Sequence, residues 1–204
     1  KKHSPRAIHA TISRAKNELV DVAEFRKHAR SYFDEVVTRC FERYQAILKE
    51  SNALDFDDLL VETVHLFEQH PTVLEFYQRR YTHLLADEYQ DTNKVQYELI
   101  KMLAGSERNL CVVGDDDQSI YSFRGANIQN ILDFEKDFRK CHVIKLEQNY
   151  RSTGHVLKAA NAVIGHNQGR KKKALWTESE DGEKITFLQV EDQNEEGRYI
   201  AREI

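Results

Sequence analysis

The fold is decided by two stretches of sequence, THLLADEYQDTN (residues 82–93) and NLCVVGDDDQSIYSFRGA (residues 109–126). Each begins with a short apolar run and continues into acidic residues, and residues 93–104 between the runs have the apolar spacing of a helix. Apolar strands that alternate with helices predict a parallel sheet covered by helices. Because ligands of such sheets bind at the carboxyl ends of the strands, both acidic clusters are predicted to lie at the functional edge.

Helical spacing and capping signals predict the rest of the chain. Ser4 and Pro5 open a first helix, and the pair Asp21 and Glu24 is typical of a capping box that opens a second, longer helix running to about residue 50. That longer helix is expected to turn these residues inward: Phe25, Ala29, Phe33, Val36, Val37, Cys40, Tyr44, Ile47 and Leu48. Further helices are expected over 55–69, 71–80, 127–138, 156–164 and 194–204, and further strands over 142–146 and 184–190.

Composition excludes several classes of protein. With 40% hydrophobic and 31% charged residues, 2 prolines and 8 glycines among 204 residues, the chain is neither disordered nor fibrous. No apolar run approaches the length of a membrane span, and the start has no apolar signal region. Three widely spaced cysteines fit neither a disulfide framework nor a zinc site, so we expect a reducing cytosol and no structural metal.

Net charge does not by itself suggest a nucleic-acid partner, because the formal value is −4. The first fifty residues carry 11 basic and 7 acidic side chains, and a solvated helical face explains this excess better than phosphate contacts do. The basic run at residues 169–173 has the same two interpretations, and again a solvated charge run is favoured over a track for DNA phosphates.

Three groups of residues carry chemistry. Asp87 and Glu88 at a strand end could hold Mg²⁺ and polarise a water, although such a pair often only caps the next helix. The second loop adds Gln118, which could bind a phosphate oxygen or a water, Tyr121 and Phe123, which could stack on bases, and Arg124, which could bind phosphate or hold a carboxylate. For these aromatic side chains, the alternative is that they fold back onto the core.

The third group is the stretch QNYR at residues 148–151. An arginine here, just past a predicted strand, could reach a γ-phosphate across a domain cleft as an arginine finger. From spacing alone, an ordinary salt bridge formed by Arg151 at the start of a helix is as well supported as an arginine finger.

The chain closely resembles the UvrD/Rep/PcrA-type superfamily 1 DNA helicases, which move 3′ to 5′ on single-stranded DNA. The resemblance rests on four stretches in the family's order, Leu54–Leu60, Asp87–Asn93, Gly114–Ala126 and Leu146–Ser152, and their flanks extend it over nearly the whole chain. It implies an α/β fold with a RecA-like parallel sheet and flanking helices, of the P-loop NTPase type, preceded by an all-helical segment. Residues 1–50 would end a helical insertion, 51–146 would form the later half of a first motor domain, and 147–204 would open a second.

The resemblance also implies roles for individual residues. Asp87 would coordinate the Mg²⁺ of MgATP, and Glu88 would be the general base. Gln118 would couple the γ-phosphate to the DNA site, and Arg151 would be the arginine finger. In the same way Tyr150 would stack on adenine, while Tyr121 and Phe123 would pack on DNA bases and Arg124 would link their loop to Glu88 or to DNA.

The implied cofactors are therefore ATP and Mg²⁺, the implied partners are single-stranded DNA, duplex junctions and the remaining parts of a longer parent chain, and the implied location is the bacterial cytosol or nucleoid. No membrane partner is expected.

The sequence departs from the family pattern in two ways. The stretch Gly-x-x-x-x-Gly-Lys-Ser/Thr, which cradles phosphates, does not occur in these 204 residues, so we expect that this chain alone does not hydrolyse ATP. Phe123 stands where many relatives have tryptophan. Phenylalanine keeps an aromatic face for stacking but lacks the indole N–H, so DNA contact there is expected to be weaker.

Three alternatives stay open at this point. The chain could belong to a helicase–nuclease of the RecB/AddA type, or it could be a non-catalytic interaction module derived from a helicase. The presence of Glu88, Gln118 and Arg151 argues against the module, which would need none of them. A nuclease that binds metal through Asp87, Glu88 and Asp91 is the weakest, because Asp91 is better explained as a helix cap.

Overall fold

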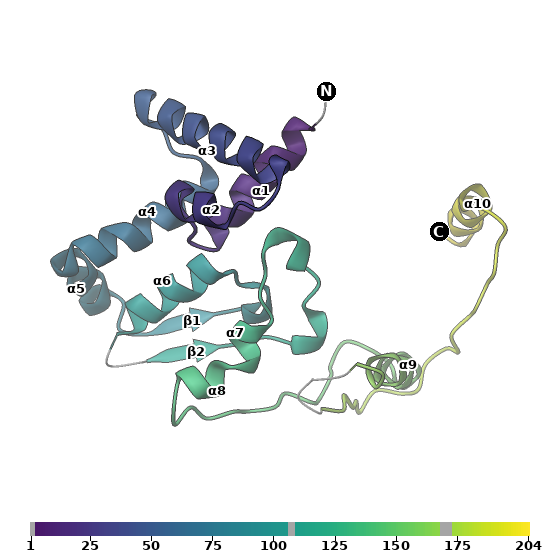
Figure 1. Ribbon diagram of the computed structural model, residues 1–204. Helices are drawn as coiled ribbons and strands as arrows, with labels where there is room; N and C mark the ends of the chain where they lie inside the picture. Colours follow the sequence, from purple (N-terminus) through teal and green to yellow (C-terminus); the bar gives the residue numbers. More distant parts are fainter. Residues whose placement is uncertain (1–2, 106–108, 168–172) are drawn as a thin grey trace. The chain divides into compact units, whose positions relative to one another are not determined.

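Helices predominate in the structure, a computed structural model that describes residues 3–105, 109–167 and 173–204 (Figure 1). The chain divides into two units, Lys1–Cys141 and His142–Ile204, and each is described by itself. None of the helices in the described part of the chain is both long and apolar enough to cross a membrane.

Three helices begin the first unit: α1 (Pro5–Asn17), α2 (Val22–His28) and α3 (Tyr32–Glu50) (Figure 1). Their shared core consists of Ile12, Ala15, Val37 and Phe41. Ile47, predicted to face inward, is 45% exposed, whereas the unpredicted Phe41 is buried.

The prediction of one long helix up to residue 50 is wrong, because α2 ends at its C-cap Ala29 and a separate helix, α3, begins at its N-cap Ser31. The Ser31 hydroxyl accepts a hydrogen bond from the Asp34 N–H, and the Asp34 carboxylate accepts one from the Ser31 N–H. This capping box fixes a new helix start. Asp21, as predicted, caps α2 by accepting from the Glu24 N–H.

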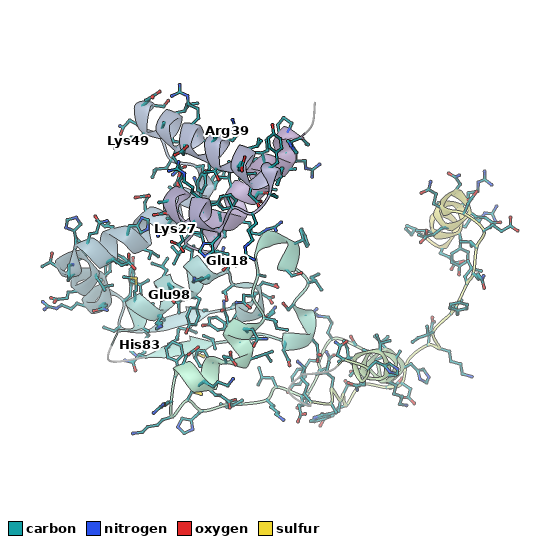
Figure 2. All side chains as sticks on the ribbon, viewed as in Figure 1. Glu18, Lys27, Arg39, Lys49, His83 and Glu98 are labelled. Carbon is teal, nitrogen blue, oxygen red and sulfur yellow. The ribbon has the colours of Figure 1, made fainter. Side chains whose placement is uncertain are left out.

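The exposed faces of these helices carry much of the basic charge of the first fifty residues. Figure 2 shows Lys27, Arg39 and Lys49 projecting from α2 and α3. All three side chains are exposed, as expected for a solvated helical face.

A parallel two-stranded sheet follows, with strands β1 (Leu84–Ala86) and β2 (Leu110–Val112) paired as Leu84 with Leu110 and Ala86 with Val112. Helix α6 (Lys94–Ala104) connects the strands and runs beside them (Figure 1). Helix α4 (Phe56–Gln69) packs on α6 through Val61, Val64 and Val95, and α5 (Pro71–Arg80) lies between α4 and β1 in the chain. These elements match the predicted positions.

A buried cluster of ion pairs connects α1 to the start of α4. Lys16 Nζ, 3% exposed, lies 2.6 Å from Asp55 Oδ2 and 2.8 Å from Asp58 Oδ1. The Tyr44 hydroxyl donates to the same oxygen of Asp55 at 2.8 Å. Burial alone would raise the pKa of the Asp55 carboxyl, but the hydrogen bonds from Lys16, the Asp58 backbone and Tyr44 together hold that pKa below its ordinary value.

The rest of the chain consists of short helices and extended segments. In place of one predicted helix over 127–138 there are two short ones, separated at Asp133, and three 3₁₀ turns occupy the loops. These elements are η1 (Tyr89–Asp91), η2 (Asp116–Gln118), η3 (Ser122–Arg124), α7 (Gln129–Leu132) and α8 (Phe134–Asp137). The second unit contains α9 (Gly154–Ile164) and α10 (Gln193–Glu203), close to their predicted bounds.

Two predicted strands are wrong. In the described part of the chain, residues 142–146 and 184–190 form no β-strand, and Ile144 and Phe187 are 81% and 87% exposed. An extended segment becomes a strand only when a neighbour accepts its hydrogen bonds, which the apolar pattern does not reveal. The described fold is therefore a mainly helical α/β structure with a small parallel sheet.

Candidate nucleotide and DNA site

The chain turns sharply where β1 ends. Glu88 has φ 49° and ψ 39°, in the left-handed region, and its N–H donates to Asp87 Oδ1 at 2.9 Å. Left-handed backbone is unfavourable for a residue with a side chain, by about 1–2 kcal/mol. The turn is held by the residue that follows β2, because the Tyr89 N–H donates to the Val113 carbonyl at 3.0 Å. Strain of this kind, held by its surroundings at a strand end, is typical of functional sites.

Gln90, for which no role was predicted, joins the two acidic loops. Its amide N–H donates to Glu88 Oε2 at 2.8 Å, and its Oε1 accepts from the Asp115 N–H at 3.0 Å. The side chain is only 1% exposed. Because the amide is buried and both of its ends are engaged, it fixes the Glu88 carboxylate relative to the second loop. A polar, uncharged residue two positions after a strand-end acid was the available signal.

Gly114 allows the second loop to approach Gln90 closely enough for the hydrogen bond from the Asp115 N–H. A Cβ atom at this position would lie 2.5 Å from Gln90 Oε1 and 2.9 Å from Ile131 Cδ1. Real Cβ atoms do not come this close to a neighbour, so the backbone can approach Gln90 only where the side chain is absent.

Asp115 organises the second loop. One of its carboxylate oxygens accepts from the Asp117 N–H at 3.0 Å, and the other accepts from Gln118 Nε2 at 2.8 Å. The structure thus connects Glu88, Gln90, Asp115 and Gln118 by consecutive hydrogen bonds, which brings the predicted residues Asp87, Glu88 and Gln118 to one edge of the sheet.

Among the described residues, one group of three carboxylates is close enough together to hold a metal ion. The carboxylates of Asp115, Asp116 and Asp117 lie within 4.8 Å of one another. Asp87, Glu88 and Asp91 form no such group among the described residues. Asp91 does not cap α6 either, because the Asn93 side chain accepts from the Gln96 N–H.

The aromatic residues of the second loop do not fold into the core. Tyr121 is 37% exposed and Phe123 is 75% exposed, and their ring centroids lie 5.9 Å apart at a tilt of 45°. Gly125, with φ 87°, ends the turn that presents them. The backbone of Arg124 lies within η3, but its side chain, for which a role was predicted, lies outside the described part of the structure.

The second unit presents Tyr150 and Arg151 from a tight turn. The Asn149 side chain accepts from the Arg151 N–H at 2.9 Å and from the Ser152 N–H at 2.7 Å. The Asn149 N–H in turn donates to the Trp176 carbonyl at 2.7 Å. Tyr150 is 83% exposed, and Arg151 is exposed as well. Both side chains are therefore accessible to a ligand. Residues 169–172 of the basic run lie outside the described residues.

Two models of protein families match the chain. Residues 1–139 match the UvrD/REP helicase N-terminal domain, and residues 144–204 match the UvrD-like helicase C-terminal domain. The chain is 53% identical over 204 residues to an ATP-dependent DNA helicase PcrA of Bacillus subtilis (strain 168), and 50% identical to that of Staphylococcus aureus (strain Mu50). All of this chain is covered in each comparison, but only 28% of the relative. The chain belongs to the UvrD/REP helicase family.

Proposed function

We propose that this chain contributes the central part of an ATP-driven DNA helicase that moves 3′ to 5′ along single-stranded DNA and acts at duplex junctions. One observation carries the proposal: Gln90 holds the Glu88 carboxylate at a strained strand end and at the same time holds the loop of Gln118, Tyr121 and Phe123. A site for hydrolysis and a surface for stacking are thereby fixed to one buried amide. The PcrA relatives are named ATP-dependent DNA helicases.

The donor set at the end of β1 fits Mg²⁺ and ATP in part. Asp87 and Glu88 are exposed carboxylates, which are the oxygen ligands and proton acceptors that such a site uses. Mg²⁺ bound there would neutralise charge on the phosphates, with Asp87 as its ligand. Glu88 would accept a proton from the attacking water, and Gln118 would contact the γ-phosphate. The glycine-rich phosphate loop is not among these residues, so the chain alone is proposed not to turn over ATP.

Two residues of the second unit also have proposed roles toward the nucleotide. Tyr150 would stack on adenine, and Arg151 would stabilise charge on the transferred phosphoryl group. We propose the division inferred from the resemblance, in which residues 1–50 end a helical insertion, 51–146 complete a RecA-like motor domain and 147–204 begin another. The same likeness to bacterial DNA helicases supports a cytosolic location.

Exposed aromatic residues of the second loop would bind the DNA. Each base stacked on an aromatic side chain is worth about 1–3 kcal/mol, so Tyr121 and Phe123 can hold a strand without reading its sequence. Arg124 would connect this loop to Glu88 or to the DNA backbone.

ATP hydrolysis by the full-length protein that carries this chain, with and without single-stranded DNA, tests the nucleotide roles. We expect Glu88→Gln to lower turnover about 10²–10⁴-fold and Arg151→Ala to lower it about 10³-fold or more. The matched controls are Glu68→Gln and Arg198→Ala, which change exposed residues of α4 and α10. If the wild-type protein had no DNA-stimulated turnover, the motor assignment would be wrong and an interaction module would remain.

Binding of a fluorescent oligothymidylate tests the aromatic surface separately. Phe123→Ala should raise the Kd at least about fivefold, from the loss of one stacked base. Phe76→Ala is the control, because Phe76 is 58% exposed on α5. Equal affinities of the two variants would remove Phe123 from the DNA site.

A further inference from the structure

A buried pair of asparagines connects the N-terminal helices to the loop that follows Glu88. Asn93 Nδ2 donates to Asn17 Oδ1 at 2.6 Å across 76 positions of sequence. Both side chains are buried, with 9% of Asn17 and 8% of Asn93 exposed. Asn17 is the last residue of α1, and Asn93 lies five residues after Glu88 and caps α6.

Every polar group of the Asn17 side chain is engaged. Its amide nitrogen donates to Asp57 Oδ1 at 3.0 Å and to the Ser13 carbonyl at 2.9 Å, while its oxygen accepts from Asn93. A buried amide with three partners on different elements has a single favourable orientation, because each lost bond would leave a buried polar group unsatisfied. Asn17 therefore fixes α1, α4 and the start of α6 relative to one another.

The second loop, which carries Tyr121 and Phe123 and is called the aromatic loop from here on, is followed by residues that bond to Thr92, next to Asn93. The Asn127 N–H donates to the Thr92 carbonyl at 2.9 Å, and Asn130 Nδ2 donates to that carbonyl at 3.1 Å. At Gly125, which ends the turn carrying Phe123, an added Cβ would lie 3.7 Å from Asn17 Cβ, at van der Waals distance. The loop that presents the aromatic rings is thus hydrogen-bonded to Thr92, the residue beside Asn93, and passes near Asn17 at Gly125.

We propose that Asn17 is a positioning residue through which helix α1 sets the aromatic loop against the loop of Glu88, and so controls how single-stranded DNA stimulates ATP turnover. The proposal deepens the proposed function and rests on it. Asn17 acts on both loops indirectly, through its bond to Asn93 and through the neighbouring Thr92 carbonyl.

Two variants of the full-length protein test this coupling. Asn17→Ala removes all hydrogen bonds of the amide. Asn93→Asp replaces the donor to Asn17 with a carboxylate oxygen, which Asn17 Oδ1 repels, and keeps the helix cap, since aspartate caps a helix as well as asparagine does. In both, we expect the DNA concentration for half-maximal stimulation to rise about tenfold, in line with the loss of a buried hydrogen bond. Turnover without DNA should stay within about twofold, because the bond from Gln90 to Glu88 is untouched.

Ser31→Asp is the matched control. It places the same new carboxylate at the cap of another helix, α3, in an exposed position. It should leave DNA stimulation unchanged. The double variant Asn17→Ala with Asn93→Asp should behave like Asn17→Ala alone, because the two residues share one bond.

The outcomes separate this proposal from the proposed function. Unchanged stimulation by DNA in Asn93→Asp, or an equal loss of basal and stimulated turnover in both variants, would mean that the bridge is only structural, with the helicase assignment intact. A wild-type protein without turnover would overturn the assignment, and the coupling with it. Unfolding temperatures measured in parallel identify a variant that has lost its fold. If Asn17→Ala does not fold, the DNA stimulation of Asn93→Asp, which retains the helix cap, tests the proposal.

Discussion

The ion cluster of Lys16 gives a sharp stability prediction. Lys16 and Asp58 are 3% and 2% exposed, and the lysine is the cation that both Asp55 and Asp58 contact. Lys16→Met keeps the aliphatic stem but leaves two neighbouring carboxylates without it. Breaking a buried ion pair in this way costs about 3–5 kcal/mol, which is a large part of the 5–15 kcal/mol that typically stabilises a domain, as an order of magnitude.

Urea unfolding of the chain at pH 7, followed by circular dichroism, measures this loss. With a slope of about 2 kcal/mol per molar urea, the midpoint should fall by about 1.5–2.5 M. Lys27→Met is the control, because Lys27 forms an exposed pair with Glu24 on α2 and should leave the midpoint unchanged. The triple variant Lys16→Met, Asp55→Asn, Asp58→Asn should recover much of the loss, since it leaves no uncompensated charge.

Acid provides an independent check on the same cluster. The pKa of Asp55 is lower in the folded chain than its ordinary value, so the carboxylate stabilises the fold above about pH 4, and this contribution is lost as the pH falls through the folded pKa. The wild-type chain should therefore lose stability below about pH 4 more steeply than Lys16→Met does. A midpoint shift for Lys16→Met of less than about 0.5 M would refute the reasoning, because it would mean that water compensates the two carboxylates.

Three further substitutions probe the site. Tyr89→Phe should raise the free energy of unfolding by up to about 1 kcal/mol, because the buried Tyr89 hydroxyl has no hydrogen-bond partner in the described structure. Burial, with a smaller effect of Asp137, raises the pKa of Tyr89 to about 12, so the wild-type chain should lose stability between about pH 10 and 12 in alkaline unfolding while the variant is spared this loss. Gly114→Ala should lower the free energy of unfolding by about 1–3 kcal/mol through overpacking against Gln90, whereas Gly197→Ala, with no atom within 4 Å, should not lower it. Glu88→Gly should abolish turnover in the full-length protein and should be more stable than Glu88→Ala by about 1 kcal/mol, because both variants lose the hydrogen bond from Gln90 and only glycine relieves the left-handed backbone; equal stabilities of the two variants would show that the turn is unstrained.

Local signals predicted the helices well and the strands poorly. Caps and apolar spacing located α1, α4, α5 and α6 within a residue or two, because a helix satisfies its own backbone hydrogen bonds. The capping box at Ser31 was missed, which merged α2 and α3 into one predicted helix. Residues 142–146 and 184–190 have strand-like sequences, but a strand also needs a partner, and that partner is a property of the fold.

The residue types at the candidate site were visible in the sequence, and their connections were not. The acids after each apolar run and the exposed aromatic residues could be identified, since a parallel sheet brings the ends of its strands together. Gln90, Asn17 and Asn93 gave no strong signal, because an amide bonds equally well to water, to its own backbone or to a residue 76 positions away.

Residue types and their local spacing are enough to place the chain in its family, to locate most of its helices and to identify the side chains that could carry chemistry. The folded chain is what shows that one buried glutamine holds Glu88 against the second loop, and that Asn17 of α1 bonds to Asn93, beside the Thr92 carbonyl to which that loop bonds. The physical reason is that a buried polar group must find its partners within hydrogen-bonding distance, and folding alone determines which groups those are.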